Sequence, residues 1–285
     1  MCVVGIGADL RPPPYESGGR AAWKTEKGAS VRVFLSLCVI AAVIVAVGIP
    51  VAGADDPEPA VFLLAVIARN SVSYESAVYG TAFFISGDGT ALTNSHVVYL
   101  AQREPERYQL LAVVNREFYS ASIVCASRLQ HDPTNPGLNI QPSRDVAKIR
   151  VSPSRFPFAR WGLNLPSGQR LLTVTAHREG LPRFPVLTVA GRPSAGDQVR
   201  VIGFGHLFPG PPGWTATGQV LGIDHTADGT EIFGVDFSGP VQPGNSGSPV
   251  LNPQDQVIGM WTWYSLTDAN IGMAIGNSAF LTPCL

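Results

Sequence analysis

Charged side chains are scarce in this sequence. Of its 285 residues, only 14% are Asp, Glu, Lys or Arg, and the formal net charge is −1. A dedicated nucleic-acid-binding protein would carry a basic face and a positive net charge, so this class is excluded. The chain is not disordered either, because 45% of its residues are hydrophobic and can form a packed core.

Features that favour helical bundles or metal sites are also missing. The 30 glycines and 24 prolines exclude a helical bundle, because both residues interrupt helices. His177, His206 and His225 lie far apart without the spacing of a metal site, so no metal or other cofactor is expected. The sequence instead contains about a dozen short apolar runs, rich in β-branched and aromatic residues and bounded by turns, which predict an all-β barrel or sandwich. One helical turn is expected, over residues 94–103.

The longest hydrophobic run, residues 33–54, carries no charge and has the character of a targeting segment. Basic residues precede it and acidic residues follow it, which places residues 1–32 in the cytoplasm and residues 55–285 outside it. Ala52 and Ala54 fit signal-peptidase cleavage after Ala54. The run is also long enough to cross a bilayer, so an uncleaved anchor is the alternative. We therefore expect an exported protein, either secreted or periplasmic, or anchored to the outer face of the cytoplasmic membrane by residues 33–54 alone.

Two of the four cysteines, Cys125 and Cys284, follow the targeting segment. In an oxidising compartment outside the cytoplasm they could form a disulfide. The alternative is one buried thiol and one free thiol near the C-terminus, because spacing alone does not fix the geometry that a disulfide needs.

Three short segments contain residue types that act together in nucleophilic catalysis. Ser246 lies in Gly-Asn-Ser-Gly-Ser-Pro, where the glycines let the backbone form an anion-binding turn around a nucleophile. His96 follows an apolar strand and a glycine turn, where a rigid imidazole could act as a base. Asp145 precedes another apolar strand and could orient that imidazole. Taken singly, the Ser246 and Asp145 segments are more often turns, and the His96 segment is also typical of a helix start capped by Asn94 or Ser95.

Taken together, and in the order His96, Asp145, Ser246, the segments resemble the active-site blocks of the trypsin-like, chymotrypsin-fold serine peptidases. The matching stretches are TAFFIS with LTNSHVV, DVAKIRV, and PGNSGSPVLNPQDQVIGMWT. They are similar to the bacterial branch that includes the Deg-type periplasmic proteases. The resemblance implies two six-stranded antiparallel β-barrels with the active site between them, the first over about 59–165 and the second over about 170–281.

The resemblance also implies a role for each residue. Ser246 would attack the scissile carbonyl, His96 would accept and return its proton, and Asp145 would hold the imidazole. The N–H groups of Gly244 and Ser246 would form the oxyanion hole. The implied function is an exported serine endopeptidase that hydrolyses protein or peptide substrates through an acyl-enzyme. The alternative is a catalytically inactive protease fold that binds peptides or protein partners; the sequence leaves the oligomeric state open.

The family pattern is not followed everywhere. Asn245 stands where the digestive members have Asp before the nucleophile, and no Ile-Val-Gly-Gly start is present, so activation by N-terminal cleavage is not expected. The sequence after Ser246 is too short for the PDZ domain that Deg-type relatives carry, so none is expected. The family alignment implies an uncharged, narrow substrate pocket and cleavage after small or medium aliphatic residues. Its residues would be Pro240, Thr262, Trp263, Tyr264 and Ile271.

Overall fold

The computed structural model describes residues 58–69, 74–115, 117–128, 145–155, 160–164, 170–174, 183–205, 214–238, 244–264, 268 and 270–280. The targeting segment at 33–54, Pro240 and Cys284 lie outside these residues. Within the described ranges, no helix is both long and apolar enough to cross a membrane.

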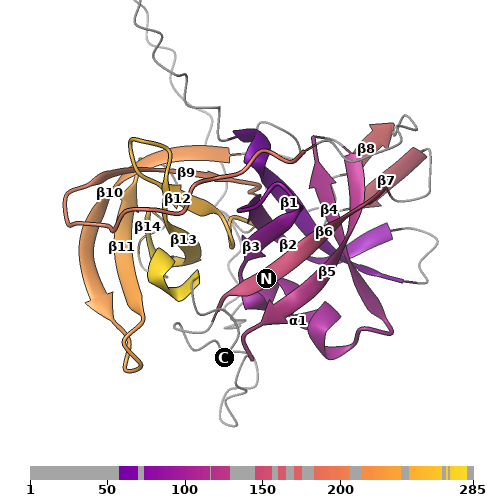
Figure 1. Cartoon of the computed structure of the whole chain (residues 1–285), viewed down its shortest axis with the longest axis horizontal. Helices are drawn as coiled ribbons and strands as arrows, with labels where there is room; N and C mark the ends of the chain where they lie inside the picture. Colours follow the sequence, from indigo (N-terminus) through magenta and orange to yellow (C-terminus); the bar gives the residue numbers. More distant parts are fainter. Residues whose placement is uncertain are drawn as a thin grey trace, which may run out of the picture. The chain divides into compact units, whose positions relative to one another are not determined.

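The described residues form an all-β structure with one α-helix, as predicted (Figure 1). Six strands form an N-terminal barrel: β1 (Val61–Ala68), β2 (Tyr74–Phe84), β3 (Thr90–Thr93), β4 (Tyr108–Val114), β5 (Glu117–Ala126) and β6 (Ala147–Arg155). Six further strands form a C-terminal barrel: β9 (Gln198–Gly203), β10 (Trp214–His225), β11 (Glu231–Phe237), β12 (Pro249–Leu251), β13 (Val257–Tyr264) and β14 (Ile271–Gly276).

The remaining elements connect or extend the barrels. Helix α1 (Ser95–Arg103) lies between β3 and β4, close to the predicted helical turn. The antiparallel hairpin of β7 (Arg160–Asn164) and β8 (Arg170–Val174) continues the N-terminal sheet through a parallel pairing of β7 with β2. Short 3₁₀ helices precede β1 and follow β14, at Glu58–Ala60 and Asn277–Phe280.

Antiparallel pairing closes both barrels. The N-terminal barrel runs β1-β4-β5-β6-β3-β2, and β1 pairs back with β2. The C-terminal barrel runs β10-β11-β14-β13-β12-β9, and β9 pairs back with β10. The two predicted six-stranded antiparallel barrels are therefore confirmed, and Figure 1 shows them side by side, purple to magenta and orange to yellow.

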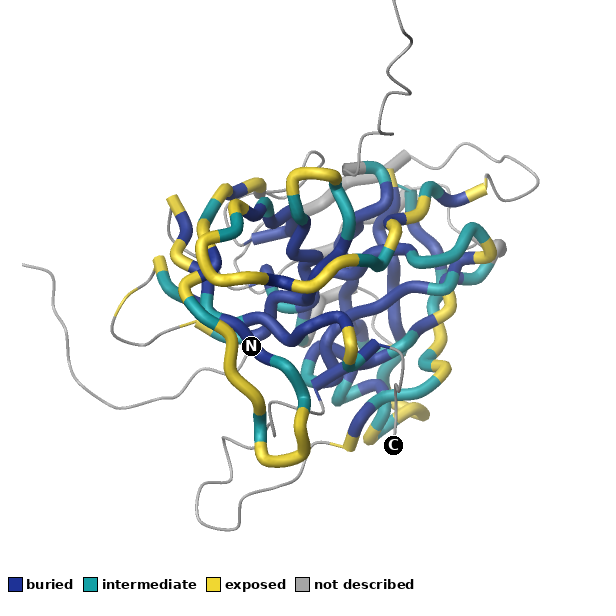
Figure 2. Tube along the Cα trace, turned by 60° about the vertical axis from the view of Figure 1, so that its left-hand side comes forward, coloured by how far each residue is buried: buried dark blue, intermediate teal, exposed yellow. Residues whose placement is uncertain are grey.

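Strand β1 shows how the barrels pack. Its sequence VFLLAVIA is buried along almost its whole length. Phe62 and Leu64 lie in the core of the N-terminal barrel, whereas Leu63 belongs to a second cluster that includes Met260 of the C-terminal barrel. Successive side chains of a strand point to opposite faces. One face of β1 therefore fills its own barrel and the other packs against the second, which is why the buried tube in Figure 2 continues through the middle of the molecule.

The segment between β8 and β9 is bonded to both barrels. Leu187 N–H donates to Phe84 O of β2 at 2.9 Å, and Val257 N–H of β13 donates to Thr188 O at 2.8 Å. The ring of Phe184 stacks on that of Phe84, with centroids 4.2 Å apart. This segment therefore links the two barrels through backbone hydrogen bonds to a strand of each.

Candidate active site

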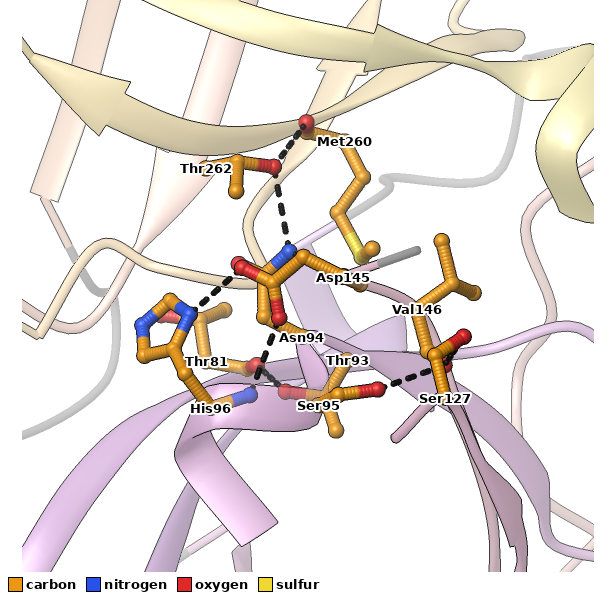
Figure 3. A network of polar contacts seen from close by, with 10 residues as sticks. All are labelled: Thr81, Thr93, Asn94, Ser95, His96, Ser127, Asp145, Val146, Met260 and Thr262. Atoms are coloured by element: carbon orange, nitrogen blue, oxygen red, sulfur yellow. Dashed lines mark hydrogen bonds and ion pairs between the residues drawn. The ribbon is translucent and has the colours of Figure 1, made fainter. Parts of the chain in front are cut away.

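His96 is held by the start of helix α1 and by Asp145. His96 is the second residue of the helix, so its backbone N–H has no acceptor within the helix. Asp145 supplies one, because its Oδ1 accepts that N–H at 2.9 Å. The other carboxylate oxygen, Oδ2, lies 2.7 Å from His96 Nδ1 (Figure 3). The sequence predicted this pairing, and one carboxylate fixes both the backbone and the ring of His96.

The contact with Asp145 selects one tautomer of a neutral His96 ring. Asp145 is fully buried, and a buried carboxylate is costly unless it is hydrogen-bonded. Its two contacts with His96, and its place at a helix N-terminus, offset that cost. An ionised carboxylate only accepts hydrogen bonds, so Nδ1 carries the proton in neutral His96 and Nε2 presents a lone pair. The pair can therefore accept a proton at His96 Nε2.

Ser246 lies in a turn that requires glycine at two positions, 244 and 247. Gly244 and Gly247 have φ angles of +99° and +88°, which side-chain-bearing residues rarely adopt. Neither position has room for a Cβ. At Gly244 it would overlap Phe204 O and the Tyr79 ring, and at Gly247 it would overlap Thr81 O and lie 2.6 Å from Thr93 Oγ1. The turn is therefore packed directly against the N-terminal barrel.

Thr81 of β2 is the residue that holds this turn, and the sequence did not single it out. Its N–H donates to Ser246 O at 2.8 Å and its hydroxyl donates to Gly244 O at 2.9 Å. The same hydroxyl accepts the N–H of Phe204 at 2.9 Å. In the sequence, only the hydroxyl at the start of the apolar run TAFF could have indicated this role, because a buried hydroxyl needs hydrogen-bond partners.

Three backbone N–H groups of the turn have no acceptor within the part of the chain that the structure describes. They are the N–H groups of Gly244, Asn245 and Ser246. Gly247 N–H donates to Trp261 O and Ser248 N–H donates to Asn245 O. Free, fixed N–H groups beside a nucleophile are what an oxyanion hole requires.

The Ser246 turn lies beside the helix that carries His96. A Cβ on Gly80 would lie 2.7 Å from Val97 Cγ2 of α1 and 2.9 Å from Ser246 O, so these two groups are close neighbours. Within the described residues, no hydrogen bond joins Ser246 to His96. Catalytic hydrogen bonds are often long in substrate-free proteins and shorten when substrate binds.

The comparison with protein families decides the identity of this fold. A family model described as a trypsin-like peptidase domain matches residues 80–260. The chain belongs to this family. The matched region runs from β2 to β13 and contains His96, Asp145 and Ser246.

Named relatives of this trypsin-like peptidase domain are of the Deg type that the motifs predicted. The chain is 26% identical over 192 residues to a "Probable periplasmic serine endoprotease DegP-like" of Chlamydia trachomatis, covering 65% of this chain and 28% of that protein. The corresponding protein of Chlamydia muridarum gives the same identity and coverage. The chain thus spans little more than a quarter of the length of these relatives.

Solved structures support the fold. A serine endoprotease from Yersinia pestis is similar with a TM-score of 0.50 at 19% identity, covering 79% of this chain and 61% of that one. An HtrA-type protease solved with a tripeptide has a TM-score of 0.53 at 20% identity, covering 81% and 61%. Both match the two-barrel architecture of this peptidase domain.

The residues predicted to line the substrate pocket differ in exposure. Thr262 is buried, with 4% of its surface exposed, whereas Tyr264 is 47% exposed. Trp263 is half-buried against the cluster between the barrels, and Ile271 is half-buried at the start of β14. Pro240 lies outside the described residues. The pocket itself stays a prediction.

The cysteine and metal expectations concern groups away from this site. Cys125 on β5 is disulfide-bonded. Cys284 lies outside the described residues, so its pairing with Cys125 stays a prediction. In the part of the chain that the structure describes, no three His, Cys, Asp or Glu side chains are grouped as a metal site.

Proposed function

We propose that this trypsin-like peptidase domain is an exported serine endopeptidase that uses Ser246, His96 and Asp145 as a triad. One observation carries the proposal: a buried carboxylate binds His96 through both ring and backbone, beside a glycine-bounded serine. The N–H groups of Gly244, Asn245 and Ser246 have no acceptor among the described residues. The relatives named as serine endoproteases support the same class of reaction.

The proposed reaction proceeds in two proton-coupled halves. Ser246 Oγ attacks the scissile carbonyl while His96 Nε2 accepts the hydroxyl proton. The N–H groups of Gly244 and Ser246 stabilise the tetrahedral oxyanion. When it collapses, His96 gives its proton to the leaving amine and an acyl-enzyme remains on Ser246. In the second half, His96 removes a proton from a water molecule, which attacks the ester. His96 then returns this proton to Ser246 Oγ as the carboxylic acid product leaves.

The substrates proposed are proteins or peptides with small or medium aliphatic side chains before the cleaved bond. An uncharged pocket floor at Pro240 could not offset the desolvation of Arg or Lys. Tyr264 and Ile271, which the resemblance to the family implies for the pocket walls, would leave little room for an aromatic ring. Discrimination among Ala, Val and Leu should be modest, because a methylene contributes only about 1–3 kcal/mol in such a pocket.

We also propose that the peptidase domain, residues 55–285, acts outside the cytoplasm. The apolar run at 33–54 would direct export, either as a cleaved signal or as an anchor. Relatives named as periplasmic endoproteases support this location. Fractionation of tagged protein tests it, and a wholly cytosolic protein would contradict both alternatives for the segment.

A fluorophosphonate probe tests the proposed reaction on the full chain, because it labels only an activated serine. Wild-type protein should be labelled at Ser246, as peptide mapping would show, and Ser246→Ala should not be labelled. Ser248→Ala is the matched control: its buried hydroxyl has no partner within the described residues, so its loss should leave labelling unchanged. A folded wild type that resists the probe would favour the inactive, peptide-binding alternative.

A further inference from the structure

Asn94 makes a contact between the two barrels that its position in the sequence does not suggest. It is the N-cap residue of α1, where an Asn side chain ordinarily accepts a helix N–H. Here it makes no such bond. Its amide nitrogen instead donates to Asp145 O at 2.8 Å and to Thr262 Oγ1 of β13 at 3.0 Å (Figure 3). The Asn94 side chain therefore connects Asp145 to the C-terminal barrel and does not cap the helix.

The direction of these hydrogen bonds is fixed by the partners. Asp145 O is a carbonyl and can only accept. The Thr262 hydroxyl gives its one proton to Met260 O at 3.1 Å, so toward Asn94 it also accepts. An amide turned the other way would place its oxygen against two acceptors. Asn94 therefore donates twice, and within the described residues its own Oδ1 is buried without a partner.

The backbone position of Asp145 depends on the hydrogen bond from Asn94, because Asp145 is not part of a strand. It precedes β6, which begins at Ala147, so no sheet ladder holds its backbone. The following residue, Val146, is held through its carbonyl by the hydroxyls of Ser95 and Ser127. The carbonyl of Asp145 is held by Asn94. The amide therefore fixes the backbone from which the carboxylate reaches His96.

On the other side, a β-bulge presents Thr262 to the bridge. In the pairing of β13 with β14, Trp261 is opposite Ala274 and Trp263 is opposite Met273, so Thr262 is the extra residue. A bulge re-aims a side chain relative to the regular alternation of a strand. Thr262 is buried and lies one residue before Trp263 and two before Tyr264, both proposed above for the pocket wall.

We propose that Asn94 is a positioning residue for the reaction, coupling the orientation of Asp145 and His96 to the β13 strand of the substrate pocket. The proposal rests on the peptidase function proposed above. Asn94 would not touch substrate; it would keep the Asp145 carboxylate at hydrogen-bonding distance from His96. Its loss should therefore slow turnover by each active molecule, with a much smaller change in KM.

The test counts active sites before it measures turnover. Full-length variants are titrated with the fluorophosphonate probe, and kcat per labelled site is then measured on a peptide substrate. Asn94→Ala should lower kcat per site on the order of 10- to 100-fold, as small misplacements of catalytic groups do. Ser95→Ala is the matched control, since it removes a neighbouring buried hydrogen bond, to Val146 O, without contact to Asp145 or β13. It should keep the wild-type kcat per site.

Thr262 provides a second, independent variant. Thr262→Val keeps the shape of the side chain but removes the hydroxyl, so it should also lower kcat per site, and Thr262→Ser should recover most of that loss. Because both changes break one bridge, the double variant with Asn94→Ala should be little slower than the slower single variant. Should Asn94→Ala fail to fold, the Thr262 pair still decides the proposal.

Three results would overturn the proposal. If Asn94→Ala loses labelled sites but each remaining site turns over at the wild-type rate, Asn94 is only structural. If Thr262→Val and Thr262→Ser behave alike, the link to β13 is wrong. If folded wild-type protein is not labelled at all, the peptidase function itself has failed, and the positioning role with it.

Discussion

The N-terminal and C-terminal barrels connect their six strands in the same way. In each, the first strand pairs with the second and the fourth, the fourth with the fifth, the fifth with the sixth, and the sixth with the third. No repeat is evident in the sequence: the first strands are VFLLAVIA and QVRVIG. Many sequences with the right alternation and turns can satisfy one strand order. The chemistry of the two barrels must therefore differ through their connections.

The connection between the third and fourth strands shows this difference. In the N-terminal barrel it contains helix α1, whose buried side includes Val97 and Val98 and which presents His96 from its first turn. In the C-terminal barrel, the connection from β11 to β12 contains the turn of Ser246, with Gly244 and Gly247 at positive φ. His96 is positioned within its own barrel, by helix α1 and by the Asp145 carboxylate. The turn is positioned by the other barrel, through Thr81.

The largest loss of activity is expected from removing the side chain of His96 or of Ser246, which lie in the equivalent connections of the two barrels. His96→Ala and Ser246→Ala should each lower kcat by roughly 10⁴–10⁶, because the members of the proposed triad would act as a unit. The double variant should then be hardly slower than either single variant. Steady-state kinetics on a peptide substrate measure all three, and multiplied losses in the double variant would show that the barrels act independently.

A smaller effect is expected from the glycines that distinguish the Ser246 turn from the helix. Gly244→Ala should lower kcat on the order of 10²–10³, as loss of an oxyanion-hole donor does, because the new Cβ would overlap Phe204 O and Tyr79 and displace the N–H. The Tyr79 ring is buried, with 6% of its surface exposed, so it has little room to move away from the new Cβ. The same burial raises the pKa of its phenol.

Gly229→Ala is the control for this change. Gly229 lies between β10 and β11 with a φ angle of +82°, but a Cβ added there would have no neighbouring atom within 4 Å. Both substitutions carry a left-handed strain of roughly 1–2 kcal/mol. Only Gly244→Ala should reduce activity, so equal losses in the two variants would assign the effect to strain rather than to the oxyanion hole.

The smallest expected effect is on thermal stability. It concerns an exposed ion pair of the N-terminal barrel, between Asp88 and Arg150 at 2.7 Å. Hydrogen bonds from Thr90, more than Arg150, lower the pKa of Asp88 from 3.8 to about 2. The ionised carboxylate therefore stabilises the fold above about pH 4, and this contribution is lost as the pH falls toward 2. Asp88→Asn should lower the thermal midpoint slightly at pH 5 and not at pH 2; a constant difference would contradict this.

The C-terminal barrel offers the matching pair, Asp255 with Arg200 at 2.5 Å. Its side chains are 27% and 33% exposed, against 53% and 46% for Asp88 and Arg150. Screening by water weakens exposed pairs more. Asp255→Asn should therefore lower the thermal midpoint at pH 7 by more than Asp88→Asn. The reverse order would mean that solvent exposure does not determine how much each ion pair stabilises the fold.

Much of the fold was predictable because it depends on local patterns. Apolar runs such as VFLLAVIA gave the strands, and the turn residues between them gave the boundaries. The helix was expected at residues 94–103 and lies at Ser95–Arg103. Asn94, one of the two cap candidates in the alternative interpretation, does occupy the N-cap. Its side chain does not cap the helix, because two acceptors outside the helix bind its amide instead.

The sequence by itself determined the strand content, the glycines around Ser246 and the pairing of His96 with Asp145, because these follow from periodicity, backbone preference and a family pattern. Only the tertiary structure decided what Thr81, Asn94 and Thr262 do. Thr81 reaches Gly244 across 163 residues, and Asn94 reaches Thr262 across 168. Such contacts depend on how two closed barrels pack, and no local preference of a hydroxyl or an amide specifies its partner in the other barrel.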